Sequence, residues 1–416
     1  MSELINNRQK KIETLKSVIT GLHQGDDPEV VKARLKDVVR EVSGDEIVAM
    51  EQQLMDEGME VSEVKAMCDL HSQVLRELIA EPGPTQRPAG HPVEVFLAEN
   101  RALAERVAAL RDSVTAVLTP ALATLPVEVL EAWRAQVEEL LELEKHYARK
   151  ENLLFPRLEA RGVTGPSQVM WAKDDDVREA LKALREALAE DQAAIEEWRV
   201  VAEQVAVPLA DQIEEMFTKE ERFLLPMAEQ KLTEAEWREI ASEGERFGYC
   251  LIDPPPPFSD EERADSDQVD GAQVTGQVTF SAGALSPAQL RGIMGALPLD
   301  ITFVDADDRV AFFSEGDRIF PRPKAVIGRK VQFCHPPKSV DVVERILADF
   351  KAGRQDSAAF WIQLHGRFVH IRYFAVREAG GDYLGTVEMS QDLTPLRALE
   401  GDRRLLEYDD EKEVSA

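Results

Sequence analysis

The chain has 416 residues, 44% of them hydrophobic, which is enough for two or three packed domains of ~100–200 residues each. Acidic residues outnumber basic ones by 78 to 49, and the net charge of −29 argues against nucleic acid and anionic membranes as general partners. Three widely spaced cysteines, no apolar N-terminal core and no apolar run of ~18 residues argue against a disulfide framework, a secretory signal and a membrane span. We therefore expect a cytoplasmic protein.

Two stretches rich in proline divide the chain. The first, EPGPTQRPAGHP at 81–92, carries four prolines and interrupts any continuous helix. The second begins with DPPPPFSDEERADSDQ and joins a proline run to an acidic, polar segment, so we predict a linker at 253–284. The other predicted parts are an N-terminal module at 1–80, a second region at 91–252, a third region at 285–400 and an acidic tail at 401–416.

Apolar residues recur at helical spacing in the N-terminal module, as in IETLKSVITGLHQG and DPEVVKARLKDVVREV, which predicts a small helical bundle. Within VSEVKAMCDLHSQVL, Cys68 and His71 lie three residues apart on one helix face, a spacing that suits a shared metal or a redox role. The alternative is a buried cysteine beside a partly exposed histidine.

The second region contains an internal repeat. HYARKENLLFPRLE at 146–159 aligns without gaps to MFTKEERFLLPMAE at 216–229. Each copy has a charged and aromatic first turn, a glutamate at the sixth position, an apolar triplet and a proline that we expect to end the helix. Each copy also follows a long helix. Two duplicated helix pairs predict a four-helix bundle, whose core can hold metal ligands.

The third region changes to alternating patterns. ALPLDITFVDADDRVAFFSEG has two short apolar runs around ADD, and AAFWIQLHGRFVHIRYFAVRE has a turn at HG, so each predicts a hairpin. Between them, SVDVVERILADFKAG has helical spacing and ends at a glycine. Strands that flank short helices predict a compact α+β domain.

These motifs resemble known families. With His146, Glu151 and Pro156, HYARKENLLFP is similar to the His-x-x-x-Glu-Glu-x-x-x-Phe-Pro motif of the hemerythrin-like (HHE cation-binding) family. LPLDITFVDADDRVAFFSEG and LGTVEMSQDLTPLRALEG resemble the opening hairpin and the closing strand of a PAS domain. The whole order is similar to DUF438-containing proteins, which VSEVKAMCDLHSQVL and FPRPKAVIGRKVQFCHPPKSVDVVERIL match. The resemblance implies a multidomain fold: an all-α N-terminal helical module, a hemerythrin-like four-helix bundle and an α+β PAS domain.

The resemblance implies metal ligands in the bundle, but the chain departs from the family's histidine-rich pattern. Glu94, Asp174 and Met216 stand where relatives often have histidine. Lys150 follows His146 by four residues, and an ammonium group beside a dication is unfavourable unless it points away. The remaining candidate ligands are His91, Glu94, His146, Glu151, Asp174, Glu220 and Glu221.

This carboxylate-rich set favours manganese or magnesium, or a carboxylate-type di-iron centre, over an O₂-carrying site rich in imidazole. The alternative is that these acids are surface residues of a bundle that has lost its metal. Both interpretations remain open at this point.

PAS domains bind small ligands or cofactors, haem and flavin among them, so the resemblance also implies a pocket in the third region. Its candidate residues are Phe303, Phe312, Phe313, Phe333, His335, Trp361 and Phe374. His335, in the motif CHPP, is the candidate axial haem ligand. An ordinary aromatic core is the alternative.

Two functions fit these features. The first is a cytosolic sensor or regulatory protein that binds a small ligand, cofactor or metal and signals through a protein partner or a homodimer, because no kinase, cyclase or DNA-binding output segment is present. The second is the handling of non-haem iron, by storage or by repair of iron–sulfur centres. No Ser-His-Asp order, nucleophile elbow or zinc-protease motif predicts a conventional enzyme.

Overall fold

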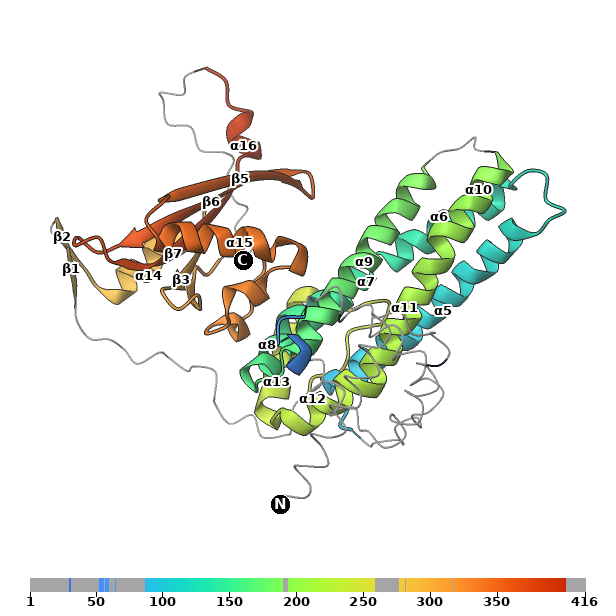
Figure 1. Ribbon diagram of the computed structural model, residues 1–416, viewed down its shortest axis with the longest axis horizontal. Coiled ribbons are helices and arrows are strands. Elements are labelled where there is room, and N and C mark those ends of the chain that lie inside the picture. Colours follow the sequence, from blue (N-terminus) through green and yellow to red (C-terminus); the bar gives the residue numbers. More distant parts are fainter. Residues whose placement is uncertain are drawn as a thin grey trace, which may run out of the picture. The chain divides into compact units, whose positions relative to one another are not determined.

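The computed structural model describes residues 30, 52–55, 57–59, 64, 87–189, 194–258, 277–280, 282–316 and 318–401 (Figure 1). These residues fall into two compact units. The first lies within residues 1–271 and 323–344, and the second within 272–322 and 345–416. Cys68 and His71 lie outside the described residues, so their shared role stays a prediction.

Four long helical rods make up the main described part of the first unit (Figure 1). The first rod is α5 (Pro92–Leu118), and the third is α9 (Gly165–Ala187). The second rod consists of α6 (Val127–Leu140), α7 (Leu143–Arg149), the π-helical turn η1 (Lys150–Leu154) and α8 (Phe155–Ala160). The fourth consists of α10 (Ile195–Val201), η2 (Ala202–Ala206), α11 (Val207–Lys219), η3 (Glu220–Leu224) and α12 (Leu225–Lys231), and it is followed by α13 (Glu234–Gly244) and η4 (Glu245–Phe247). This order confirms the predicted four-helix bundle.

The two sequence repeats share an unusual backbone feature. The π-helical turns η1 and η3 occupy matching positions of the repeats, and each is followed by a helix that has a proline in its first turn, Pro156 or Pro226. The prediction that these prolines end the helix is wrong, because the rods continue to Ala160 and Lys231. A proline lacks an amide donor, and the wider π-helical turn before it already departs from the regular bonding pattern, so the rod can continue.

A charged layer lies between two apolar layers of the bundle core. One apolar layer includes Leu103, Tyr147, Val177 and Ile213, one from each rod. The other includes Phe96, Leu153, Met170 and Leu224. Between them, every rod contributes buried ionisable residues, among them Glu99, Lys150, Asp174 and Glu220. Each rod therefore alternates along its length between burying apolar area and burying charge.

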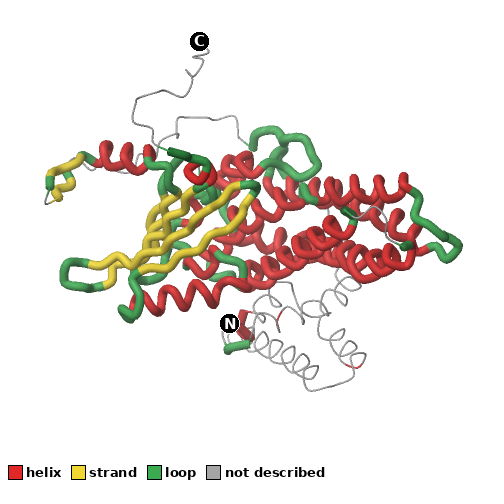
Figure 2. The backbone as a smooth tube through the Cα atoms, turned by 90° about the horizontal axis from the view of Figure 1, so that it is seen from above, coloured by secondary structure: helices red, strands yellow, loops and turns green. Residues whose placement is uncertain are grey.

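The second unit is built on an antiparallel sheet, whose strands run side by side in Figure 2. Its strand order is β4-β3-β7-β6-β5. The strands are β3 (Asp300–Asp305), β4 (Val310–Phe313), β5 (Ser357–Leu364), β6 (Arg367–Arg377) and β7 (Tyr383–Asp392). The predicted turn between β5 and β6 is confirmed at His365 and Gly366, which have φ of 49° and 78°, as a tight two-residue hairpin turn requires.

Short elements complete the structure. The hairpin of β1 (Val278–Phe280) and β2 (Gly283–Leu285) precedes α14 (Pro287–Ala296) and lies in the last part of the predicted linker. The helix α15 (Pro337–Lys351) precedes β5, and α16 (Thr394–Arg397) follows β7. The short turns η5 (Lys324–Val326) and η6 (Val331–Cys334) belong to the first unit, although they lie within the region predicted to be the PAS domain.

Gly385 provides a test of the sheet geometry. It lies in β7 with φ of 153°, and a Cβ atom at this position would collide with the carbonyl oxygen of Val304 and the ring of Phe303. We expect Gly385→Ala to destabilise the second unit by ~1–3 kcal/mol, because the backbone or the ring must move. Urea unfolding measures this loss. In Gly380→Ala the added Cβ meets no described atom within 4 Å, so this control should change stability by less than ~0.5 kcal/mol. Equal effects of the two substitutions would contradict the described packing.

Candidate functional site

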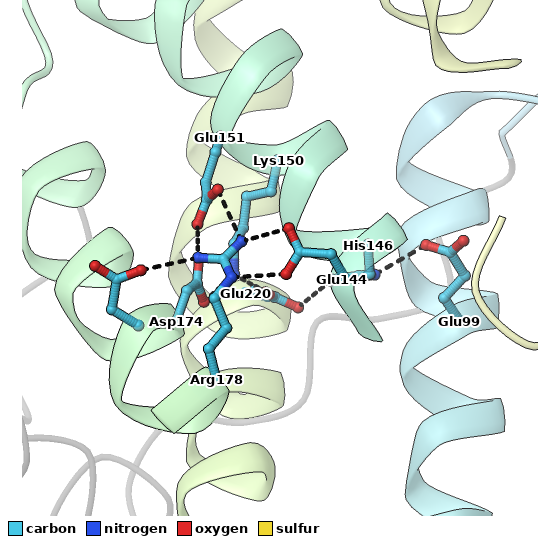
Figure 3. Close-up of polar contacts among 9 residues, drawn as sticks. Glu99, Glu144, His146, Lys150, Glu151, Asp174, Arg178 and Glu220 are labelled. Carbon is cyan, nitrogen blue, oxygen red and sulfur yellow. Dashed lines mark hydrogen bonds and ion pairs between the residues drawn. The ribbon is translucent and has the colours of Figure 1, made fainter. Parts of the chain in front are cut away.

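Lys150 lies at the centre of the buried charged layer (Figure 3). Its side chain is fully buried, and its Nζ donates to Asp174 Oδ1 at 2.9 Å and to Glu220 Oε1 at 2.5 Å. Nζ also lies 4.2 Å from the centre of the Tyr147 ring. Burial disfavours the ammonium ion, but the charges of Asp174 and Glu220 outweigh burial and raise the pKa of Lys150. Lys150 is therefore a buried cation.

His146 bridges two carboxylates one turn earlier on the same rod. Its Nδ1 lies 2.9 Å from Glu99 Oε2, and its Nε2 lies 3.0 Å from Glu220 Oε2. Burial opposes the imidazolium, yet Glu220 and Glu99 together raise the pKa of His146. Burial likewise opposes the charge of Glu220, but Lys150 and His146 lower the pKa of Glu220 to about 2. The favoured form is thus a charged histidine that donates from both ring nitrogens.

Glu99 connects this layer to the end of the bundle domain. Its Oε1 accepts the backbone amide of Cys250 at 2.6 Å, and its Oε2 also contacts the guanidinium of Arg149. Burial favours the neutral carboxyl, but His146, Arg149 and the Cys250 amide outweigh it and lower the pKa of Glu99. Glu99 is therefore a charged carboxylate with two hydrogen-bond donors, His146 and the Cys250 amide, and one ion-pair partner, Arg149.

Arg178 closes the other side of the network (Figure 3). Its guanidinium donates to both oxygens of Glu151, at 2.8 and 3.0 Å, and to both oxygens of Glu144, at 2.7 and 3.1 Å. Burial raises the pKa of Glu151 despite Arg178. Burial, with a contribution from Glu151, raises the pKa of Asp174 well above its ordinary value despite Lys150. The neighbouring acids Glu151 and Asp174 therefore hold a proton more readily than exposed acids do.

These donors do not fit a bound metal ion. A dication would need the oxygens of Asp174 and Glu220 that Lys150 already occupies, and the buried ammonium would repel it. Both nitrogens of His146 face carboxylates, so neither presents a lone pair to a metal in this arrangement. Within the described ranges, no group of three or more His, Cys, Asp and Glu residues is arranged to hold a metal ion. The arrangement is an ion-pair network that holds charge and protons.

The network brings together four of the predicted metal ligands: His146, Glu151, Asp174 and Glu220. All four are buried, so the idea that these acids are surface residues is wrong for Glu151, Asp174 and Glu220. The sequence pattern could not reveal this, because it does not show which way an acidic side chain of a helix faces.

The other three predicted ligands have different partners. His91 caps the N-terminus of α5, where its Nδ1 accepts the Val93 amide at 3.2 Å, Glu94 pairs with Arg87 at 2.7 Å, and Glu221 accepts from Asn100 at 3.3 Å. No hydrogen bond or ion pair described for these side chains joins them to Lys150. The predicted ligand set is therefore split.

Sequence reasoning missed Glu99, Arg149 and Arg178, and it treated Lys150 only as an obstacle to metal binding. One signal was present. Lys150 and Glu220 occupy the same position in the two aligned repeats, but they carry opposite charges. Equivalent positions of a duplicated helix pair face the same part of the bundle core, so these two side chains were candidates for an ion pair.

Four aromatic residues predicted to line a PAS pocket share one face of the sheet. The register pairs Phe303 with Phe312 and with Val387, and it pairs Val387 with Phe374. Trp361 on β5 lies opposite His370, four residues before Phe374 on β6, so it points to the same face. Phe312 is 41% exposed and Trp361 66% exposed. These residues therefore form part of an open apolar surface instead of a closed pocket.

The remaining three candidates lie elsewhere. Phe313 points to the opposite face of the sheet, with the Arg318 guanidinium 5.1 Å from its ring centre. Phe333 and His335 belong to the first unit, where they line a cavity of about 490 Å³ together with Trp171 of α9. Because Phe312 and Phe313 point to opposite faces of the sheet, the seven side chains cannot all line one pocket, and the prediction that they do is wrong. The short segment after Arg322 packs with the helices, and no periodicity in the sequence indicates this.

Three family profiles match the chain. Residues 15–81 match a family of unknown function, DUF438. Residues 91–236 match the hemerythrin HHE cation binding domain, and residues 290–394 match a PAS domain. The chain therefore belongs to the proteins that carry a DUF438 module, a hemerythrin-like domain and a PAS domain in this order, and the predicted architecture is confirmed.

Solved structures also resemble parts of the chain. The C-terminal domain of a protein from Streptococcus mutans is 36% identical over 30% of this chain and 98% of that one, with a TM-score of 0.29. A PAS domain from Colwellia psychrerythraea is 14% identical over 26% of this chain and 97% of its own, with a TM-score of 0.22. A sensory box sensor histidine kinase from Vibrio cholerae is 13% identical over 25% and 89%, with a TM-score of 0.21. No curated protein matches the chain. Among the described residues, no helix is both long and apolar enough to cross a membrane.

The substitution Lys150→Met tests the network. It leaves Asp174 and Glu220 in the core without their shared cation, so we expect a loss of ~3–5 kcal/mol in the free energy of unfolding of the first unit. Urea unfolding followed by circular dichroism at the helix band measures it. The matched control is Lys182→Met, whose side chain is 76% exposed and whose Nζ lies 3.9 Å from Glu186, so the expected change is below ~0.5 kcal/mol. A loss at Lys150 no larger than the control's would contradict a buried ion pair.

Proposed function

We propose that this protein is a cytosolic sensor or regulatory protein whose hemerythrin-like bundle works without a resident metal. One observation carries the proposal: the ammonium group of Lys150 is buried and bonded to Asp174 and Glu220. In a carboxylate-rich bundle, a metal ion would supply the positive charge that joins acids from different helices. Here Lys150, together with His146 and Arg178, supplies that charge.

The hemerythrin-like and PAS domains together support a sensor that binds a ligand. The alternative, iron storage or repair of iron–sulfur centres, requires donors that take up and release iron. That alternative is weaker because the acids that would bind iron are already bonded to cations of the protein itself. It would need the lysine to leave the core.

Elemental analysis tests this proposal. Full-length protein expressed in medium rich in iron and manganese, then desalted, is expected to hold well below one metal atom per chain, because Lys150 competes for the acidic donors. In Lys150→His the cation becomes an imidazole that can bind metal, so the metal content should rise. The control is His146→Gln in the wild-type background, which should leave the low metal content unchanged.

About two iron or manganese atoms per wild-type chain, the number expected of a carboxylate di-metal centre, would overturn the metal-independent proposal. If those atoms were also lost in His146→Gln, the result would favour the iron-handling alternative.

For the output, we propose contact between two copies of the chain through the PAS-like unit. β5 is an edge strand of the sheet, and its side chains Phe360, Trp361 and Ile362 are exposed. An exposed edge strand offers unpaired backbone groups beside apolar side chains, which are features of a protein contact. A second copy fits because antiparallel pairing of one strand with its own copy is self-complementary about a two-fold axis.

The substitution Trp361→Lys should therefore convert dimers into monomers at micromolar concentration, because it places a charge on the edge strand. Size-exclusion chromatography with light scattering measures the mass. The control is Val342→Lys, which adds the same charge at an exposed apolar position of α15 and should leave the mass unchanged. A wild-type protein that is monomeric throughout would rule out the homodimer and leave a different protein as partner.

A further inference from the structure

A second feature of the bundle domain, a small cavity, lies outside the charged layer. Its volume is about 250 Å³, close to the lower end of the ~300–1,000 Å³ of ligand sites. The start of α5, the helix α13 and the segment 255–258 line it. Its walls are of mixed polarity, and Val95, Phe96, Ile240, Pro256 and Phe258 are among the apolar residues that line it.

One buried cation, Arg149, also lines this cavity. Its side chain is only 5% exposed, and its guanidinium carbon lies 5.2 Å from the ring centre of Phe96 and 4.9 Å from that of Tyr249. The two rings, which line the same cavity, hold the guanidinium in place. Among the described residues, Arg149 Nε has no hydrogen-bond partner. A buried donor without an acceptor is unfavourable, so the Arg149 guanidinium keeps hydrogen-bonding capacity that Glu99 does not use.

The charge at the mouth of the cavity is mixed. The exposed residues Arg238, Ser242 and Glu245 also line the cavity. Arg238 and Glu245 carry charges of opposite sign. Glu99, the charged partner of Arg149, does not line the cavity, so the buried charge that a ligand inside it meets is that of Arg149.

We propose that this cavity binds a small carboxylate that carries a flat apolar group. The planar guanidinium of Arg149 matches a carboxylate in shape and charge, and the apolar walls match the remainder of the ligand. The proposal rests on the proposed function, because it names the class of ligand that the sensor detects. It places the input of the sensor in the helical bundle.

The present partner of Arg149 does not prevent this binding. Glu99 contacts Arg149, but it also accepts from His146 and from the Cys250 amide. When Arg149 donates to a ligand carboxylate, Glu99 keeps these two donors and is not left without partners. The ligand and Glu99 thus compete for one guanidinium, and the competition acts on the residue that holds His146.

Inorganic phosphate is a weaker candidate for the same site. It carries close to two charges at neutral pH and is strongly hydrated, whereas the cavity offers one buried guanidinium and a partly apolar wall. A carboxylate with an aromatic ring loses less hydration and buries more apolar area. Phosphate therefore serves as a competing outcome of the test.

Titration calorimetry on the full-length protein tests the proposal, with sodium benzoate as the probe. We expect benzoate to bind with one site per chain and benzamide, which has the same shape but no charge, to bind at least 10-fold more weakly. Ala241→Phe places a ring in the cavity and should weaken benzoate binding at least 10-fold. Ala235→Phe, an exposed position of the same helix outside the cavity lining, is the matched control and should bind as the wild type does.

Circular dichroism shows whether Ala241→Phe is folded. If it is not, Ser242→Trp, which narrows the exposed mouth, takes its place with the same expectation. Equal affinities for benzoate and benzamide, unchanged binding in the cavity variants, or binding of phosphate in place of benzoate would each overturn the proposal. The metal analysis is a separate measurement, so metal in the bundle would overturn the proposed function without affecting the benzoate result.

Discussion

The rest of the bundle depends on the contact of Lys150 with Asp174 and Glu220. Three rods of the bundle meet in this contact, and His146 extends it to Glu99 on the first rod, α5. Charges in an apolar core are costly unless each has its partners, so the four rods have little freedom to slide or rotate relative to one another. Apolar layers on both sides tolerate small shifts better, because hydrophobic contact is not directional. The charged layer therefore sets the register of the rods, and the apolar layers supply most of the driving force.

The repeat explains how such a layer arises in this sequence. In one copy, the position before the shared glutamate is a lysine, and in the other copy it is a glutamate. The two residues at these equivalent positions form an ion pair, with Lys150 Nζ 2.5 Å from Glu220 Oε1. Two acids at these positions would repel each other unless they shared a proton or a cation. A lysine at one of the two positions supplies that cation from the chain itself.

The sequence predicts the fold more fully than it predicts the roles of the buried charged residues. Helical periodicity, the duplicated motif and the alternation of the strands were sufficient for the bundle, the hairpin turn at His365 and the order of the domains. They identified His146, Glu151, Asp174 and Glu220 as candidate site residues, but they did not reveal that these residues form ion pairs. Whether an acid binds a metal or a lysine depends on which side chains share its space, and partners such as Glu99 and Arg178 come from motifs with no distinctive pattern.

The prediction of one PAS pocket was wrong for a related reason. Aromatic residues in alternating strands were grouped by type, whereas the sheet separates them by the parity of their positions. Phe312 and Phe313 are adjacent in the sequence and must lie on opposite faces, so no single pocket can include both side chains. A grouping by strand register would have separated them, but register depends on pairing between distant strands, which one sequence does not specify.

A bundle held by a lysine also differs from a metal-bound one in how it can respond to a signal. A metal centre changes its charge or its ligands when it is oxidised or binds a small molecule. The ammonium of Lys150 has a raised pKa and stays charged, so the centre of this network is fixed. A response to a signal must therefore begin at the edge of the network. There, a carboxylate can lose one partner without leaving a buried charge unpaired. Glu99 meets that condition, because it has two hydrogen-bond donors and an ion-pair partner, and that partner, Arg149, lies at the wall of a cavity. The same redundancy that keeps Glu99 satisfied makes Arg149 available to a ligand.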